Sequence, residues 1–208
     1  MDSFYFFPLL ALGLAATVQY FLGSKKNRWL GTKISEQLES RLKPKDTEYV
    51  NIGGVIGYNF VYRLREPWKE AKGSFTFLPR HSLLYMPFAL LVGHTDRFYL
   101  NLFTDKRLLG EGHILDARHN RITRIDGVDS MKSENLERDG KTFFLYWRDE
   151  EMHQVLKETL EAFPEPKTLS HFCCFDDNKT FFLFLRPKKG MVEANLAAFA
   201  EICPRYFR

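Results

Sequence analysis

Six histidines are the first candidates for chemistry in this chain of 208 residues. They are His81, His94, His113, His119, His153 and His171. None follows the His-Glu-x-x-His spacing of a zinc helix, and His113 and His119 have no cysteine or paired carboxylate ligand set nearby. We therefore expect no metal site and no cofactor.

Nucleophiles are present without a supporting motif. Ser82, Ser170, Cys173 and Cys174 occur outside any nucleophile elbow or family signature. The pair Asp176-Asp177 could act as an acidic pair, but Asp is also typical of hairpin turns, and we favour the turn. The sequence therefore predicts a protein that is not an enzyme.

The three cysteines, Cys173, Cys174 and Cys203, are odd in number and include no Cys-x-x-Cys pair. This pattern is typical of reduced, buried thiols in a cytosolic domain, and it argues against both a disulfide framework and a zinc site.

The basic residues are unevenly distributed. The chain has 30 Lys and Arg against 26 Asp and Glu, but removing Lys25, Lys26, Arg28, Lys33 and Asp2 leaves 26 against 25. This balance argues against general DNA binding. A second basic set is either a solvated surface, which we favour, or an RNA contact: Arg186, Lys188, Lys189, Arg205 and Arg208.

The element that must position all of these residues is the uncharged, mainly apolar run from Phe4 to Leu22. As a helix it rises roughly 28 Å, about the thickness of a hydrocarbon core, so we predict a membrane span. A buried core helix and a cleaved signal peptide are the alternatives. A signal peptide would carry a positive charge before the run and a small-x-small site after it, whereas Asp2 precedes this run and bulky residues end it.

The four cations Lys25, Lys26, Arg28 and Lys33 form a basic collar directly after this run. The positive-inside tendency then places the N-terminus in the lumen and the rest in the cytosol, with the collar on anionic lipid headgroups. We expect an anchor over residues 1–23, the collar with an amphipathic helix over 24–46, and a cytosolic domain over 47–208. The narrow apolar stripe of that helix, formed by Leu30, Ile34, Leu38 and Leu42 with charges of both signs on the other faces, favours packing on the domain over lying in the membrane interface.

Strands are predicted from alternation and turn residues, and helices from a period of 3.6. The expected strands cover residues 48–52, 55–64, 74–78, 97–104, 112–115, 121–125, 141–148, 169–175 and 180–186; the expected helices cover 150–163 and 192–203. Polar residues 126–140 are expected to link two halves. The fold class is α+β, with a mainly antiparallel sheet and helices packed on it after one N-terminal transmembrane helix.

The segment from His81 to Val92 is apolar on all faces and too short to span a bilayer. A buried helix kinked at Pro87 is the favoured interpretation. The alternative is an exposed patch that faces a membrane or a partner, formed by Leu83, Leu84, Met86, Phe88 and Leu91.

Four stretches resemble the calumin family: residues 20–27 (Tyr-Phe-Leu-Gly-Ser-Lys-Lys-Asn), 77–84 (Phe-Leu-Pro-Arg-His-Ser-Leu-Leu), 169–173 (Leu-Ser-His-Phe-Cys) and 179–187 (Lys-Thr-Phe-Phe-Leu-Phe-Leu-Arg-Pro). Their order and spacing carry the resemblance over residues 15–208. Members are single-pass endoplasmic-reticulum proteins that partner a small membrane protein in the PAT (protein associated with the translocon) complex.

This resemblance implies a non-enzymatic assembly factor at the ribosome-associated translocon that assists insertion or folding of multipass membrane proteins. The implied partners are a membrane-protein subunit, translocon components and the ribosome. The chain lacks the family's acidic lumenal region and its long basic coiled coil, which puts calcium binding and ribosome contact in doubt. The expected location is the membrane of the endoplasmic reticulum, or the plasma membrane with a cytoplasmic domain if the protein is prokaryotic. The alternatives are a membrane-tethered enzyme or a lipid-binding module with a pocket facing the membrane.

Overall fold

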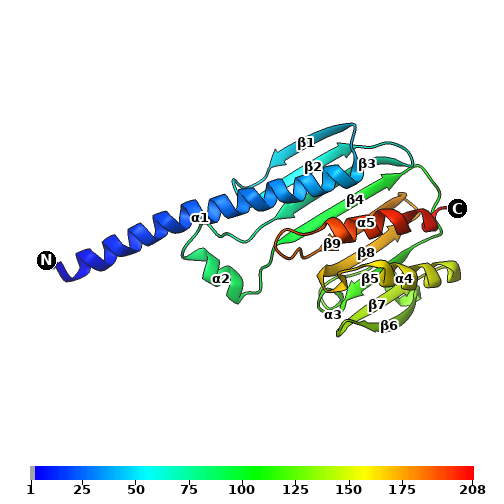
Figure 1. The fold of residues 1–208 in the computed structure, drawn as a ribbon. Helices are drawn as coiled ribbons and strands as arrows, with labels where there is room; N and C mark the ends of the chain where they lie inside the picture. The colour runs from blue at the N-terminus through cyan, green and yellow to red at the C-terminus, as the bar shows by residue number, and fades with distance from the viewer. Residues whose placement is uncertain (1–2) are drawn as a thin grey trace.

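The computed structural model describes residues 3–208, so Asp2 lies outside the described residues. Its first element, α1, is a single helix from Ser3 to Leu42, about 60 Å long at 1.5 Å per residue. The predicted membrane span and the predicted amphipathic helix are thus two parts of one helix (Figure 1). Pro8 is close enough to the N-terminus that its missing N–H interrupts little of the hydrogen-bond ladder.

Nine strands form one sheet, and every pairing between described strands is antiparallel. Their order across the sheet is β1-β2-β3-β4-β9-β8-β5-β7-β6. The bounds are β1 Asp46–Asn51, β2 Gly57–Arg63, β3 Trp68–Thr76, β4 Arg97–Thr104, β5 Gly112–Asp116, β6 Lys132–Arg138, β7 Lys141–Trp147, β8 Leu169–Phe175 and β9 Thr180–Leu185.

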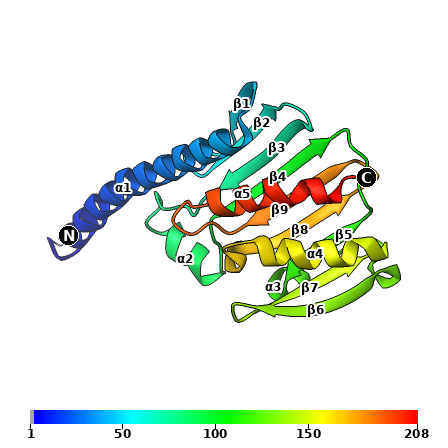
Figure 2. The same ribbon diagram turned by 45° about the vertical axis from the view of Figure 1, so that its right-hand side comes forward.

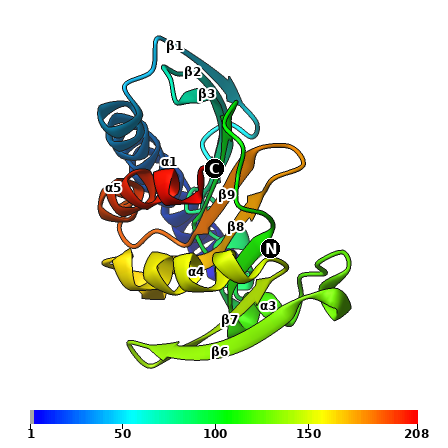
Figure 3. The ribbon, with the colours of Figure 1, turned by 90° about the vertical axis from the view of Figure 1, so that its right-hand side faces the viewer.

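The helices lie on both faces of this sheet, but unequally. The C-terminal half of α1 covers one face together with two later helices, as Figures 2 and 3 show, and α3 lies on the other. The remaining helices are α2 Tyr85–Leu91, α3 Ala117–Asn120, α4 Glu150–Ala162 and α5 Glu193–Ile202, with short 3-10 turns η1 Val128–Ser130, η2 Pro166–Thr168 and η3 Cys203–Tyr206. The expected α+β class with a sheet and packed helices is confirmed.

The hydrophobic core lies between the sheet and α1, α4 and α5. Leu30, Ile34 and Leu38 of α1 are buried, so the amphipathic part of α1 packs on the domain. The facing strands contribute aromatic rings at alternate positions, and Phe60 and Phe98 stack with centroids 6.2 Å apart. Alternation with a period of two puts such side chains on one face of each strand.

Two expectations for the polar middle of the chain are wrong. Residues 121–125 follow α3 as a turn and irregular chain rather than as a strand. Residues 126–140 are not a linker, because they contain η1 and the edge strand β6, which pairs with β7. An edge strand exposed to solvent needs few apolar residues and is protected by charge, so its sequence resembles a loop.

Substitution of Ile34 by Ala should test the packed half of α1. Ile34 is fully buried, so its loss should destabilise the domain by about 2–5 kcal/mol through lost burial and a residual cavity. Val18, which is exposed on the same helix, provides the matched control Val18→Ala. Thermal unfolding of the full chain in detergent should show a lower midpoint for Ile34→Ala alone; equal shifts in both variants would contradict this packing.

Candidate functional site

The N-terminal part of α1 projects from the domain with its side chains exposed (Figure 1). By length and composition it is the one helix among the described residues that could cross a membrane, and only 6% of its most apolar stretch is buried. A core helix would be mostly covered, so that alternative is wrong. A membrane anchor and a signal sequence both fit these properties.

The loop between β3 and α2 rests directly on the backbone of α1. A Cβ atom on Gly23 would lie 2.1 Å from the carbonyl oxygen of Arg80, so only glycine permits this approach. Gln19 Nε2 donates a hydrogen bond to the same oxygen (2.6 Å), and Asn27 Nδ2 donates to the carbonyl oxygen of Leu78 (2.8 Å). These polar residues of α1 therefore hold the loop.

Arg80 and Asp96 close this contact as an ion pair. Arg80 donates from Nη1 to Asp96 Oδ1 (2.9 Å) and from Nη2 to Asp96 Oδ2 (2.7 Å), a bidentate geometry that fixes both side chains. Arg80 Nη1 also donates to Asn27 Oδ1 (3.0 Å), and the Leu78 amide donates to Asp96 Oδ1 (2.9 Å). The start of α2 and the start of β4 are thus joined to α1.

Replacing Gly23 by Ala should separate this loop from α1. The added Cβ would overlap the backbone at Arg80 and His81, and overpacking of this kind typically costs about 1–3 kcal/mol. Gly13 is the matched control, because a Cβ there meets nothing within 4 Å. Hydrogen exchange should show faster exchange at residues 77–84 in Gly23→Ala and no change in Gly13→Ala. Unchanged protection in both would contradict the contact.

The helix α2 presents an apolar surface to solvent. Leu91 is 85% exposed and Leu84 is 78% exposed, and Ala89 is the buried residue of the helix. Of the five patch residues predicted from the sequence, Leu84, Phe88 and Leu91 are exposed, and Leu83 and Met86 are half-buried. The buried, kinked helix is therefore wrong: Pro87 lies in the first turn of a seven-residue helix, where proline is tolerated.

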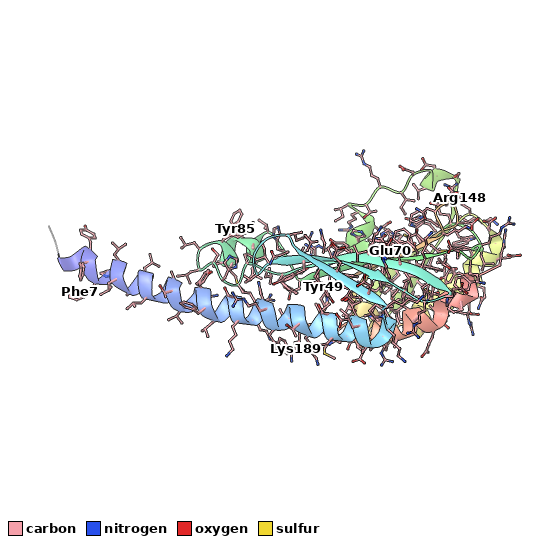
Figure 4. The ribbon with its side chains drawn as sticks, turned by 90° about the horizontal axis from the view of Figure 1, so that it is seen from above. Phe7, Tyr49, Glu70, Tyr85, Arg148 and Lys189 are labelled. Atoms are coloured by element: carbon pink, nitrogen blue, oxygen red, sulfur yellow. The ribbon has the colours of Figure 1, made fainter. Side chains whose placement is uncertain are left out.

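The apolar surface of α2 lies at the end of the domain from which α1 projects. In Figure 4, Tyr85 is near that end, whereas Arg148 is at the opposite end. The exposed residues of α2 and its flanks are Leu84, Tyr85, Phe88, Leu90, Leu91 and Val92. A cavity of about 320 Å³ adjoins them, lined by Tyr85 and His94 together with Ile52 and Ile56 of the β1–β2 turn. We call this set of exposed residues the α2 patch.

The basic collar begins on α1 just after Gly23, the residue that contacts the loop before α2. Lys25, Lys26 and Arg28 are exposed, and Lys33 is half-buried and 3.7 Å from Glu36. Lys26 Nζ lies 4.0 Å from the ring centroid of Trp29, an exposed aromatic residue. Cations and an amphipathic ring at this position suit the headgroup region of a bilayer.

A depth measurement can test whether the α2 patch enters a bilayer. The native cysteines are buried, so a nitroxide can be attached selectively to Leu91→Cys. The control is Met191→Cys, because exposed Met191 contacts Gln37, about 22 Å along α1 beyond Leu22. In vesicles, the label at 91 should collide more with oxygen than with an aqueous nickel chelate, and the label at 191 should do the reverse. Equal accessibility at both positions would contradict membrane contact.

The second basic set is not gathered into one surface. Arg186 is half-buried between Phe184 and the buried Asp116, with which it pairs at 3.8 Å. Lys188 and Lys189 precede α5 and are exposed. Arg205 and Arg208 follow α5 and pair with two acidic residues of α4, Glu158 and Glu151 respectively. These pairings support a solvated surface over an RNA contact.

The candidate nucleophilic and acidic residues either bind nearby backbone amides or lie on opposite faces of the sheet. Ser82 Oγ accepts a hydrogen bond from the amide of Tyr85 (3.3 Å) at the start of α2. Asp176 Oδ1 accepts from the amide of Leu108 (2.8 Å), in keeping with the turn. Cys173 and Cys174 are buried neighbours on β8, and alternation along a strand puts them on opposite faces of the sheet.

One cluster of histidine and cysteine side chains is not predicted by sequence spacing. Strands β5 and β8 pair, so His113 lies opposite Cys173 although 60 positions separate them in the chain. His113 Nδ1 is 3.3 Å from His171 Nε2, and His113 Nε2 is 3.2 Å from Glu111 Oε1. No local spacing could reveal this cluster; only the register of β5 on β8 brings its members together.

Burial determines the protonation of this cluster. Burial lowers the pKa of His113, and the hydrogen bond that His113 donates to Glu111 opposes this shift. Burial, with the positive potential of the neighbouring histidines, lowers the pKa of His171 to about 3. Burial raises the pKa of the Cys173 thiol well above its ordinary value. At neutral pH the two rings are therefore neutral and the thiol is protonated.

Comparison with known protein families found no match, and comparison with curated proteins found none.

Proposed function

We propose that this protein is a membrane-anchored, non-enzymatic assembly factor that binds apolar segments of other membrane proteins at the membrane surface. The observation that supports this most directly is the α2 patch, an exposed apolar helix held against the helix that could span the bilayer. Soluble proteins rarely expose such surfaces unless they contact a membrane or another protein.

The geometry favours binding over transformation of a substrate. His113 and His171, the histidines that converge, are 2% and 7% exposed, so a substrate could not reach them without opening of the chain. The α2 patch is instead accessible and carries few polar groups. A surface of this kind can shelter a transmembrane segment until its final partners are in place.

In this proposal the protein is anchored in the membrane of the endoplasmic reticulum, with its N-terminus in the lumen and its domain in the cytosol. In a prokaryote the membrane would be the plasma membrane, with the domain in the cytoplasm. The basic collar then contacts anionic headgroups. The resemblance to the calumin family supplies the more specific proposal: a partner subunit and components of the ribosome-associated translocon, during biogenesis of multipass membrane proteins.

Site-specific crosslinking can test this function. A photoreactive amino acid at Phe88 should crosslink to newly made multipass membrane proteins or translocon subunits in native membranes. Ile122 is the control position, because it is an exposed apolar residue in the segment after α3 and outside the α2 patch. The variant Phe88→Glu should reduce co-purification of the same partners several-fold, and Ile122→Glu should leave it unchanged. A monomer without partners at native expression, or equal crosslinking from both positions, would disprove the proposal.

A further inference from the structure

The cluster around His113 has the composition of a metal site. His113, His171 and Cys173 each place a ligand atom within 4.8 Å of the other two, and all three residues are buried. They come from two paired strands, which fix their relative positions through the backbone. Imidazole and thiolate together are the donor set that zinc prefers.

The distance between the two histidine nitrogens suits ligands of a tetrahedral ion. Two nitrogen ligands, each 2.0–2.1 Å from zinc, lie about 3.3 Å apart in tetrahedral geometry. The distance between His113 Nδ1 and His171 Nε2 is 3.3 Å. We propose that His113 Nδ1, His171 Nε2 and Cys173 Sγ bind one Zn²⁺ ion.

Glu111 holds His113 in the orientation that binding requires. Its carboxylate accepts a hydrogen bond from His113 Nε2, which leaves Nδ1 without a proton and directed at the cluster. Arg148 Nε donates to the other carboxylate oxygen (2.5 Å) and fixes Glu111 in turn. A carboxylate behind a histidine ligand is a recurrent second layer of zinc sites.

His119 is a candidate for a fourth ligand position. Its ring centroid is 5.4 Å from that of His171, and its Nδ1 is buried without a hydrogen-bond partner among the described residues. Asp116 Oδ1 accepts a hydrogen bond from the His119 amide (2.6 Å) and begins α3, which carries this histidine onto the sheet. A buried polar nitrogen without a partner is costly, and a metal ion or ordered water would remove that cost.

Binding replaces the thiol proton of Cys173 with the metal and releases that proton to solvent, so the ion with one thiolate and two neutral imidazoles carries one positive charge. The Glu111 carboxylate lies next to His113 and stabilises that charge, while it also pairs with Arg148. The site would join β5, β8 and the α3 segment, which gives it a structural role independent of the proposed membrane function.

The test uses the full chain in detergent after removal of metal with a chelator. Cobalt should produce a thiolate-to-cobalt charge-transfer band and tetrahedral visible bands at one equivalent. Competition with a chromophoric chelator should then give the zinc affinity. Cys173→Ser should remove the charge-transfer band and weaken zinc binding more than 100-fold, and Glu111→Gln should weaken it about 10–100-fold.

Cys174→Ser is the matched control, because Cys174 is an equally buried thiol on the opposite face of β8. It should keep both the band and the affinity. X-ray absorption of the zinc-loaded wild-type chain should show one sulfur and at least two nitrogen ligands, and this measurement holds even if a cysteine variant fails to fold. Absence of zinc and cobalt binding, equal loss in both cysteine variants, or binding of Cu(I) without zinc would overturn the proposal.

Discussion

The structure depends on one helix that is continuous between two environments. Residues 5–22 are mostly apolar and exposed, with Gln19 as the polar contact to the loop before α2, whereas residues after Gly23 bury a stripe that includes Ile34 in the core. Because hydrogen bonding continues through Gly23, the two halves cannot rotate independently. The Arg80–Asp96 pair and Asn27 extend this rigidity to α2. The orientation of the α2 patch relative to the projecting helix is therefore set by the fold.

The two faces of the sheet are used differently. The face covered by α1, α4 and α5 holds the large hydrophobic core. The opposite face carries aromatic and imidazole rings beneath a short helix, including Tyr99 stacked on Phe184 at 4.4 Å and the rings of His113 and His171. Neutral imidazoles can be buried there because they pair with each other and with Glu111. A face of this composition offers potential metal ligands, whereas the helical face holds the core that stabilises the domain.

Local patterns predicted much of the fold. The alternation of Arg97–Thr104 and the turn between Phe175 and Thr180 identified β4 and the β8–β9 hairpin, because both signals are local. Strand β6 was missed because an edge strand needs few apolar residues. The exposure of α2 contradicted the usual rule that apolar helices are buried, a rule that assumes water on all sides. The histidine cluster required the register of β5 on β8, which no spacing along the chain encodes.

The unbroken length of α1 has a mechanical consequence. If its projecting half spans a bilayer, any tilt imposed by bilayer thickness passes to the whole domain without loss, because no hinge separates them. A change in tilt of about 10° would move the end of the domain that carries Arg148, the end opposite α2, by on the order of 5–10 Å (Figure 4). The domain would then act as a lever that converts local membrane thickness into displacement of its distal surface.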